Sequence, residues 1–146
     1  MDRISHSFLE HSGILAFAHR GDQDSGPENT MAAFEGAARL GFQYIETDVH
    51  ATSDGVLLAF HDPILDRLTD QRGRIDRLEW SSLRHVRVAG TEPIARLEEI
   101  LGEFPDLRVN IEPKSDVAVE LLINAIRRTG AETRVCVGSF SDRRLR

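Results

Sequence analysis

The feature that most constrains this 146-residue chain is the alternation of short apolar runs with helix-like segments. The apolar runs predict strands at residues 14–18, 42–49, 55–60, 107–111 and 134–137. An alanine-rich helix is expected between a cap at Asn29 or Thr30 and a terminating Gly41, and further helices are expected at residues 97–103 and 116–129. Alternating strands and helices are typical of a parallel sheet or barrel, so the predicted fold class is α/β.

Residues 64–93 interrupt this alternation with a charged stretch, in which only residues 79–85 show a short helical pattern. After the last predicted strand, the polar-rich residues 141–146 resemble the start of another helix. We expect residues 1–146 to form one domain, with residues 64–93 as a small insertion.

Charge and composition argue against several classes of protein. Eighteen basic and 24 acidic residues give a net charge of −6, which disfavours nucleic acid as the main partner. Because no apolar stretch approaches about 18 residues, no transmembrane segment is expected. Residues 1–13 lack the apolar core of a signal peptide, which favours a cytoplasmic location. Cys136 is the only cysteine, so no intramolecular disulfide can form, and it is expected to be buried as a small apolar side chain.

Residues that can bind phosphate, metal ions or protons gather where the first four predicted strands end. They are His19 and Arg20, Glu46 and Asp48, His61, and Glu112 and Lys114. In α/β folds, ligands bind at the carboxyl ends of strands, so these side chains are expected to meet. Alternation along a strand puts Glu46 and Asp48 on one face, and it does the same for Glu112 and Lys114.

Three of these residues, Glu46, Asp48 and Glu112, are candidate metal ligands. Converging carboxylates repel one another and take up protons unless a cation neutralises them. Oxygen ligands suit a hard ion, so the expected cofactor is one divalent cation, Mg²⁺ or Ca²⁺. The alternative is that Glu46 and Asp48 lie on a solvated face, which their apolar neighbours and strand-end position disfavour.

Two histidines, His19 and His61, each close a strand and are candidate general acid–base catalysts. Histidine suits proton transfer because its ordinary pKa, about 6.5, lies near neutral pH. His50 is expected on the face of its strand opposite Asp48 and is left out of the site. The remaining histidines are interpreted as structural or exposed residues, namely His6, His11 and His85.

Two cations, Arg20 and Lys114, are candidate phosphate ligands. A guanidinium can hold a phosphate through two hydrogen bonds, and an ammonium supplies a point charge. The alternatives are a salt bridge from Arg20 to a loop acid such as Asp22, and a solvent-exposed strand end at Lys114.

Several short motifs occur in the order, and at close to the spacing, of a known family. They are His19-Arg20-Gly21, Pro27-Glu28-Asn29-Thr30, Glu46-Thr47-Asp48-Val49, Asp54-Gly55, His61-Asp62 and the pair Glu112 and Lys114. Over residues 15–140 the chain therefore resembles the glycerophosphodiester phosphodiesterase family, and residues 64–93 resemble the insertion of that family. Each motif is short, but their ordered combination is hard to obtain by chance.

The resemblance implies a TIM-type (β/α)8 barrel of the phosphodiesterase kind, of which this chain supplies about five strands. It also implies hydrolysis of a small-molecule phosphodiester to glycerol 3-phosphate and an alcohol such as choline or ethanolamine. His19 and His61 would form the acid–base pair, and Glu46, Asp48 and Glu112 would hold the cation. Arg20 and Lys114 would neutralise the phosphate. Glu28 and Asn29 match a family motif but are interpreted mainly as loop and cap residues.

In the family scheme that the resemblance implies, the metal ion activates the glycerol hydroxyl for attack on phosphorus. One histidine protonates the leaving alcohol, and water then opens the cyclic phosphate.

Two departures from the family pattern stand out. Pro113, between Glu112 and Lys114, cannot donate to a strand ladder, so the strand is expected to end there. A complete (β/α)8 barrel needs roughly 200 to 250 residues, so an open edge is expected, through which the chain can self-associate. The alternatives are a related phosphodiesterase acting on lysophospholipids or sphingomyelin, and an incomplete barrel that binds a metal or a partner without catalysis.

Overall fold

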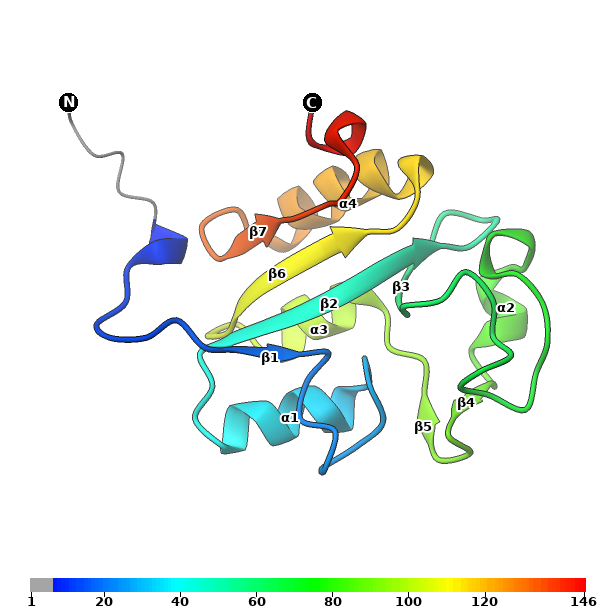
Figure 1. Ribbon diagram of the computed structural model, residues 1–146. Coiled ribbons are helices and arrows are strands. Elements are labelled where there is room, and N and C mark those ends of the chain that lie inside the picture. Colours follow the sequence, from blue (N-terminus) through cyan, green and yellow to red (C-terminus); the bar gives the residue numbers. More distant parts are fainter. Residues whose placement is uncertain (1–6) are drawn as a thin grey trace.

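The computed structural model describes residues 7–146 as helices packed on a five-stranded sheet (Figure 1). The strands are β1 (Phe17–His19), β2 (Tyr44–Ala51), β3 (Leu57–Ala59), β6 (Arg108–Pro113) and β7 (Val135–Val137). Four of them are parallel in the order β1-β2-β6-β7, and β3 pairs antiparallel with β2.

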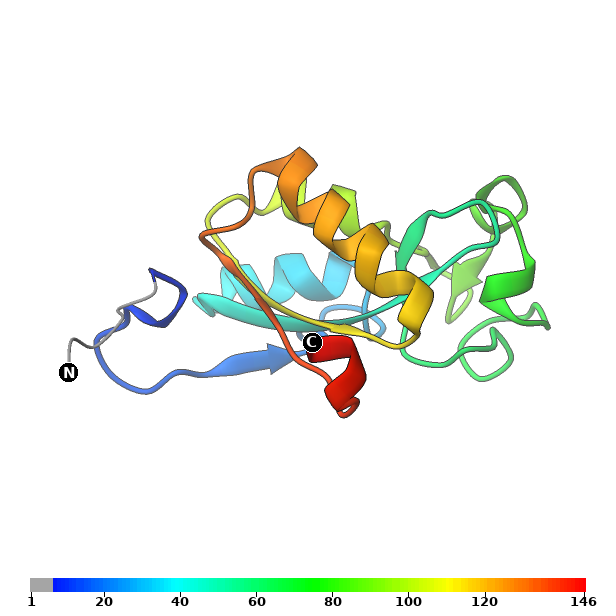
Figure 2. The ribbon, with the colours of Figure 1, turned by 90° about the horizontal axis from the view of Figure 1, so that it is seen from above.

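The longer helices are α1 (Met31–Arg39), α3 (Leu97–Glu103) and α4 (Asp116–Thr129). Figure 2 shows all three on the same face of the sheet. Parallel strands with helices along one face are the layout of a TIM-type barrel, in which the helices form the outer ring. The predicted fold class is therefore confirmed, and the chain forms part of such a barrel.

Side chains alternate between the two faces of the sheet, as the sequence predicts. Ile45 and Val49 of β2 and Val109 and Ile111 of β6 are fully buried in the core beneath the helices. Complete burial of one such side chain stabilises a fold by about 1.5–3 kcal/mol. The opposite, helix-free face receives the acidic residues of the same strands.

Two predicted helix boundaries have a clear local cause. The Thr30 hydroxyl accepts a hydrogen bond from the Ala33 backbone N–H at 3.3 Å and so caps α1. Gly130, with φ +61°, ends α4 in the left-handed conformation that glycine adopts without strain. The predicted end of a strand at Pro113 is also confirmed, because Pro113 is the last residue of β6.

The chain between β3 and α3 forms a small subdomain beside the sheet. It contains a 3₁₀ helix (Ile75–Arg77), α2 (Trp80–Leu83), β4 (Arg87–Val88) and β5 (Glu92–Pro93). Leu65, Ile75 and Leu83 are buried in an apolar cluster of their own. Short 3₁₀ helices at Ser7–Leu9 and Asp142–Leu145 lie near the two ends of the chain.

One predicted barrel strand is wrong in direction. Residues 55–60 were expected to continue the parallel pattern, whereas β3 returns antiparallel along β2, with Val49 opposite Ala59. Only residues 52–56 connect the two strands, and a parallel connection needs about a dozen residues or more. Gly55, at φ +83°, makes the tight turn that this hairpin requires.

One side-chain prediction is also wrong. Cys136 is exposed rather than buried, because β7 lies at the edge of the described sheet and pairs only with β6. His6 lies outside the described residues. Within residues 7–146, no helix has the length and apolar character needed to cross a membrane.

Candidate active site

One open pocket of about 430 Å³ brings together all seven side chains predicted for the site. They are His19, Arg20, Glu46, Asp48, His61, Glu112 and Lys114, and the lining is completed by Asn110, Gly138, Ser139 and Phe140. These residues come from β1, β2 and β6 and from the segments that follow β1, β3, β6 and β7. The parallel strands bring residues far apart in sequence together on one face of the sheet. His61 joins them because antiparallel β3 returns along β2, and the Phe60 backbone N–H donates to the Asp48 carbonyl oxygen at 3.0 Å.

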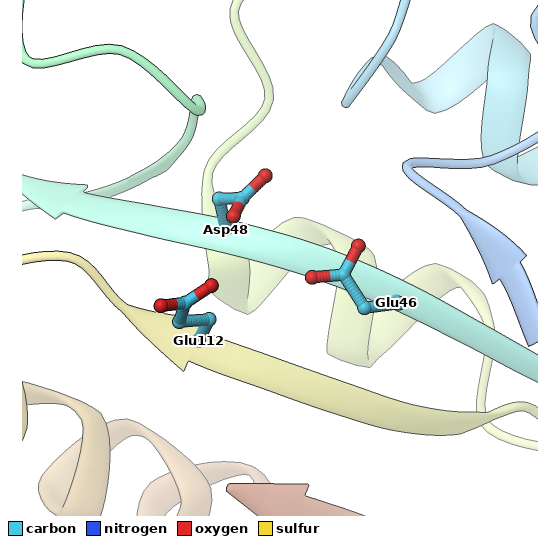
Figure 3. Close-up of side chains that lie close together, drawn as sticks. All are labelled: Glu46, Asp48 and Glu112. Carbon is cyan, nitrogen blue, oxygen red and sulfur yellow. The ribbon is translucent and has the colours of Figure 1, made fainter. Parts of the chain in front are cut away.

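The three carboxylates lie on two neighbouring strands. Asp48 and Glu112 are paired residues in the β2–β6 ladder, and Glu46 precedes Asp48 by two positions on the same face. One oxygen from each carboxylate lies within 4.8 Å of the others (Figure 3). Their side chains are largely buried, with exposed fractions of 2% for Asp48 and 15% for Glu46. This excludes the alternative of a solvated face.

Glu46 has the electrostatic properties expected of a metal ligand. Burial, and next the charge of Asp48, raise the pKa of Glu46 to about 7. Its Oε2 atom is buried and accepts no hydrogen bond from the part of the chain that the structure describes. The His19 Nε2 atom lies 3.8 Å from Glu46 Oε2. A buried carboxylate oxygen without a hydrogen-bond donor is unfavourable, and a bound cation would remove that cost. The three carboxylates are therefore suited to holding a metal ion.

Arg20 and Lys114 lie on either side of Asp48. The Arg20 Nε atom is 3.1 Å from Asp48 Oδ2, and the Lys114 Nζ atom is 3.3 Å from Asp48 Oδ1. Lys114 also donates to Glu112 at 3.2 Å, and Arg20 donates to Glu28 at 3.2 Å. Both cations are mostly buried, so neither an exposed strand end nor an ion pair with Asp22 describes them. They neutralise part of the acidic charge while facing the pocket.

The two histidines lie at or just after strand ends and differ in their surroundings. His19 ends β1 opposite Glu46 in the β1–β2 ladder, and 65% of its side chain is exposed. His61 follows β3, and its Nδ1 atom lies 2.7 Å from Asp62 Oδ1. Hydrogen bonding of Nδ1 to a carboxylate leaves Nε2 as the atom able to exchange a proton.

Asn29 contributes more to the site than the expected cap. It is buried at 2% exposure, and its amide group donates to Asp48 Oδ2 at 3.3 Å. Its carbonyl oxygen accepts a hydrogen bond of 2.8 Å from the Thr47 hydroxyl. The residue has φ +59°, a left-handed conformation that asparagine tolerates better than most residues. The sequence signal for this role of Asn29 is its place in the Pro27–Thr30 motif. Of the two residues predicted as the helix cap, Thr30 is the one that caps α1.

The expectation that His50 lies on the face of its strand opposite Asp48 is wrong. It lies two positions after Asp48 in β2, and alternation therefore puts it on the same side of the strand. Its ring is buried and its Nε2 atom lies 3.0 Å from the backbone carbonyl oxygen of His61. His50 therefore supports the segment that carries a pocket histidine, and desolvation holds the pKa of His50 below its ordinary value.

The protein is similar to known phosphodiesterases along most of its length. It is 46% identical over 140 residues to "Probable glycerophosphodiester phosphodiesterase 2" of Mycobacterium tuberculosis, a match that covers 95% of this chain and 53% of that protein. It is also similar to the crystal structure of a glycerophosphodiester phosphodiesterase from Agrobacterium tumefaciens. That likeness has a TM-score of 0.81 at 30% identity and covers 88% of this chain and 58% of the other.

A third likeness is to a phosphodiesterase of Oleispira antarctica, solved in complex with the product sn-glycerol-3-phosphate. It has a TM-score of 0.79 at 25% identity, covering 88% of this chain and 58% of that one. The chain thus spans a little over half the length of these relatives. Residues 19–145, which contain every residue of the pocket, match the Glycerophosphoryl diester phosphodiesterase family, and the chain belongs to that family.

Proposed function

We propose that this chain carries the active site of an enzyme that hydrolyses glycerophosphodiesters to glycerol 3-phosphate and an alcohol. The observation that carries the proposal is the single pocket lined by two histidines, three carboxylates and two cations. Cleavage of a phosphodiester needs neutralisation of the phosphate charge and proton transfer to and from oxygen, and these residue types supply both. Family membership and the glycerol-phosphate product bound by the Oleispira enzyme support the same chemistry.

Glu46, Asp48 and Glu112 would hold one divalent cation, Mg²⁺ or Ca²⁺. The fit rests on oxygen-only donors, on their mutual approach within 4.8 Å and on the hydrogen-bond deficit at Glu46. A cation bound there would polarise the attacking hydroxyl and a phosphoryl oxygen. Arg20 and Lys114, on either side of Asp48, would orient the phosphate by charge.

His19 and His61 would move the protons. One imidazole accepts the proton of the attacking hydroxyl, and the other donates a proton to the leaving alcohol oxygen. Asp62 contacts the Nδ1 atom of His61, which leaves Nε2 for proton exchange with a substrate oxygen. His19 lines the pocket beside Glu46, with its Nε2 atom 3.8 Å from Glu46 Oε2.

The direct test is release of glycerol 3-phosphate from glycerophosphocholine in the presence of Mg²⁺ or Ca²⁺. EDTA should abolish the release, and excess cation should restore it. His19→Ala should lower kcat by about 10²–10⁴-fold, whereas a change at the exposed His85 should leave it unaltered. Activity that survives either EDTA or His19→Ala would contradict the mechanism.

Two alternatives have distinct outcomes in the same experiment. A lysophospholipid or sphingomyelin substrate that is cleaved faster than glycerophosphocholine would assign the site to a related lipid phosphodiesterase. A folded monomer that binds Ca²⁺ but cleaves none of these substrates would show that this chain binds without catalysis. Light scattering distinguishes such a monomer from an aggregate.

Three predictions from the sequence are retained as proposals. Residues 1–146 are one domain with an insertion at 64–93, which limited proteolysis can test. The edge strands β1 and β7 allow self-association, which would appear as a concentration-dependent mass. A cytoplasmic location is testable with a tagged protein.

A further inference from the structure

Arg67, in the insertion, joins the loop that carries Glu28 to the segment that carries Asp62. Its Nε atom donates to Asp62 Oδ2 at 2.6 Å, and its Nη2 atom lies 3.3 Å from Asp62 Oδ1. Its two terminal nitrogens also donate to Glu28, at 2.8 and 3.2 Å. One guanidinium thus binds two carboxylates with its full fork of donors, in the geometry for which arginine is specifically suited.

The backbone around Arg67 is held in place by apolar burial. Leu65 is 1% exposed in the core of the insertion, and Leu68 packs against that core. The Leu65 carbonyl accepts backbone hydrogen bonds from Leu68 at 3.3 Å and from Thr69 at 3.1 Å. Arg67 therefore lies on a fixed turn rather than on a free loop, although 46% of its side chain is exposed.

The contact continues from Asp62 to a pocket histidine. Asp62 uses Oδ2 for Arg67 and Oδ1 for the His61 Nδ1 atom, at 2.7 Å. The hydrogen bond from Arg67 is the largest cause that lowers the pKa of Asp62 to about 2, so Asp62 is ionised at all working pH values. An ionised carboxylate at Nδ1 favours the tautomer in which Nδ1 carries the proton and Nε2 is free.

Two further contacts restrict the movement of this arrangement. The His61 backbone carbonyl lies 3.0 Å from His50 Nε2, which holds the main chain at the position of the imidazole. Glu28, the other partner of Arg67, also accepts a hydrogen bond from Arg20 at 3.2 Å. The insertion is thereby connected to both a pocket histidine and a pocket cation.

We propose that Arg67 is a positioning residue, which acts through Asp62 to hold His61 in the Nδ1–H tautomer with Nε2 available for proton transfer. The inference rests on the proposed function for its catalytic consequence, but not for its structural content. It gives the insertion a specific part in catalysis. The contrasting interpretation is a surface ion pair of little consequence, which is the usual case for exposed charges.

The chain offers a matched control for that contrasting interpretation. Arg74 lies in the same insertion and pairs with Asp76 at 2.7 Å, with both side chains about half exposed. Neither residue contacts a pocket histidine in the described part of the chain. Replacement of Arg74 by alanine removes an arginine ion pair of similar length without touching His61.

The test of the positioning role is NMR of the protein labelled with ¹⁵N-histidine, which reports the tautomer without any substrate. In the natural protein, the His61 resonances should be those of the Nδ1–H form. Arg67→Ala should shift them toward the mixture of a free imidazole, Arg67→Lys should restore part of the difference, and Arg74→Ala should change nothing. An unaltered His61 tautomer in Arg67→Ala would overturn the proposal.

The catalytic consequence has its own measurement. Arg67→Ala should lower kcat for glycerophosphocholine by about 10- to 100-fold, the range for partners that orient a catalytic ligand, with little change in KM. In combination with Asp62→Asn, the two losses should overlap rather than multiply, because both act on His61. A tautomer shift in a protein without hydrolytic activity would support the positioning role and reject the proposed function. Hydrolytic activity in Arg67→Ala with an unchanged His61 tautomer would support the proposed function and reject the positioning role of Arg67.

Discussion

The acids and the histidines of the pocket are held by different parts of the molecule. Glu46, Asp48 and Glu112 lie on adjacent parallel strands, whose backbone ladder sets their spacing. His19 is the last residue of β1 and His61 follows β3, and 65% and 34% of their side chains are exposed. The backbone ladder therefore fixes the three acids relative to one another, whereas side-chain contacts orient the exposed rings of the histidines.

This difference separates two requirements of the site. Strands can hold like charges together against their repulsion, because shifting one residue would disrupt the whole ladder and its buried face. Histidines that exchange protons need solvent access and one fixed nitrogen, which a loop residue with a carboxylate partner can supply. Changes to the histidines should therefore affect turnover, and changes around the acids should affect cation binding.

The largest effect is expected for His61→Ala. Loss of a proton-transfer group should lower kcat by about 10²–10⁴-fold while cation affinity stays unaltered. Steady-state kinetics and calorimetric Ca²⁺ titration measure the two quantities, with His85→Ala as the control at an exposed histidine. A loss of cation affinity in His61→Ala would show that the two groups do not work separately.

The next effect is expected for Asp48→Asn. Changes in the partners of metal ligands cost about 10- to 100-fold in affinity, so removal of a ligand charge should lower Ca²⁺ or Mg²⁺ affinity by more than about 100-fold. Calorimetric titration measures it, and the exposed acid Glu35 on α1 provides the control Glu35→Gln. Unchanged affinity would exclude the acidic cluster as the cation site.

Asn29→Ala should destabilise the fold at the acid cluster. It leaves the buried Thr47 hydroxyl without its acceptor and places alanine at a left-handed φ, with an expected loss of about 1–3 kcal/mol in the free energy of unfolding. Urea unfolding measures this loss. The exposed Asn124 on α4 gives the matched change Asn124→Ala, for which stability should be retained. Equal stability of the two variants would contradict a structural role for Asn29.

The smallest effect is the pH dependence of cation binding. The pKa of Glu46 is about 7, and a cation requires the ionised carboxylate, so protonation competes with binding below that pH. Affinity should rise by about tenfold between about pH 6 and pH 8, with release of a proton on binding. Titrations in two buffers of different ionisation enthalpy measure that proton. Glu46→Gln should abolish its release.

The same raised pKa predicts how the cation-free protein responds to pH. Its folded state binds the Glu46 proton more tightly than the unfolded state, whose pKa is near 4.5. The stabilisation is fully present below about pH 4.5 and is lost as the pH rises through about 7. Urea unfolding of the natural protein and Glu46→Gln across this range would show the difference, and saturating cation should remove it.

Much of the site could be predicted because it follows from local rules. The alternation of Glu46 with Ile45, and of Glu112 with Ile111, assigned each side chain to a face. The position of His19, at the end of an apolar run, assigned it to the carboxyl edge of the sheet. The same rule places His50 on the side of Asp48, two positions along β2. The five residues between β2 and β3 would likewise have predicted a hairpin.

Other features depend on residues that meet only when the chain folds. Asn29 contacts Asp48 across 19 residues, and Arg67 contacts Glu28 across 39. No local pattern marks Arg67, because it lies in the charged segment where no periodicity was found. The exposure of Cys136 depends on which strands lie beside β7, which the amino acids near it do not specify.

The sequence by itself determined the α/β fold class, the family and seven of the residues that line the pocket, because strand alternation and short ordered motifs are properties of neighbouring positions. Only the tertiary structure decided how those residues are held. It paired Asp48 with Glu112 through the strand register, left Glu46 Oε2 buried without a hydrogen-bond donor among the described residues, and brought Arg67 to Glu28. The physical reason is that register, burial and ion pairing depend on distances between segments, which exist only in the folded chain.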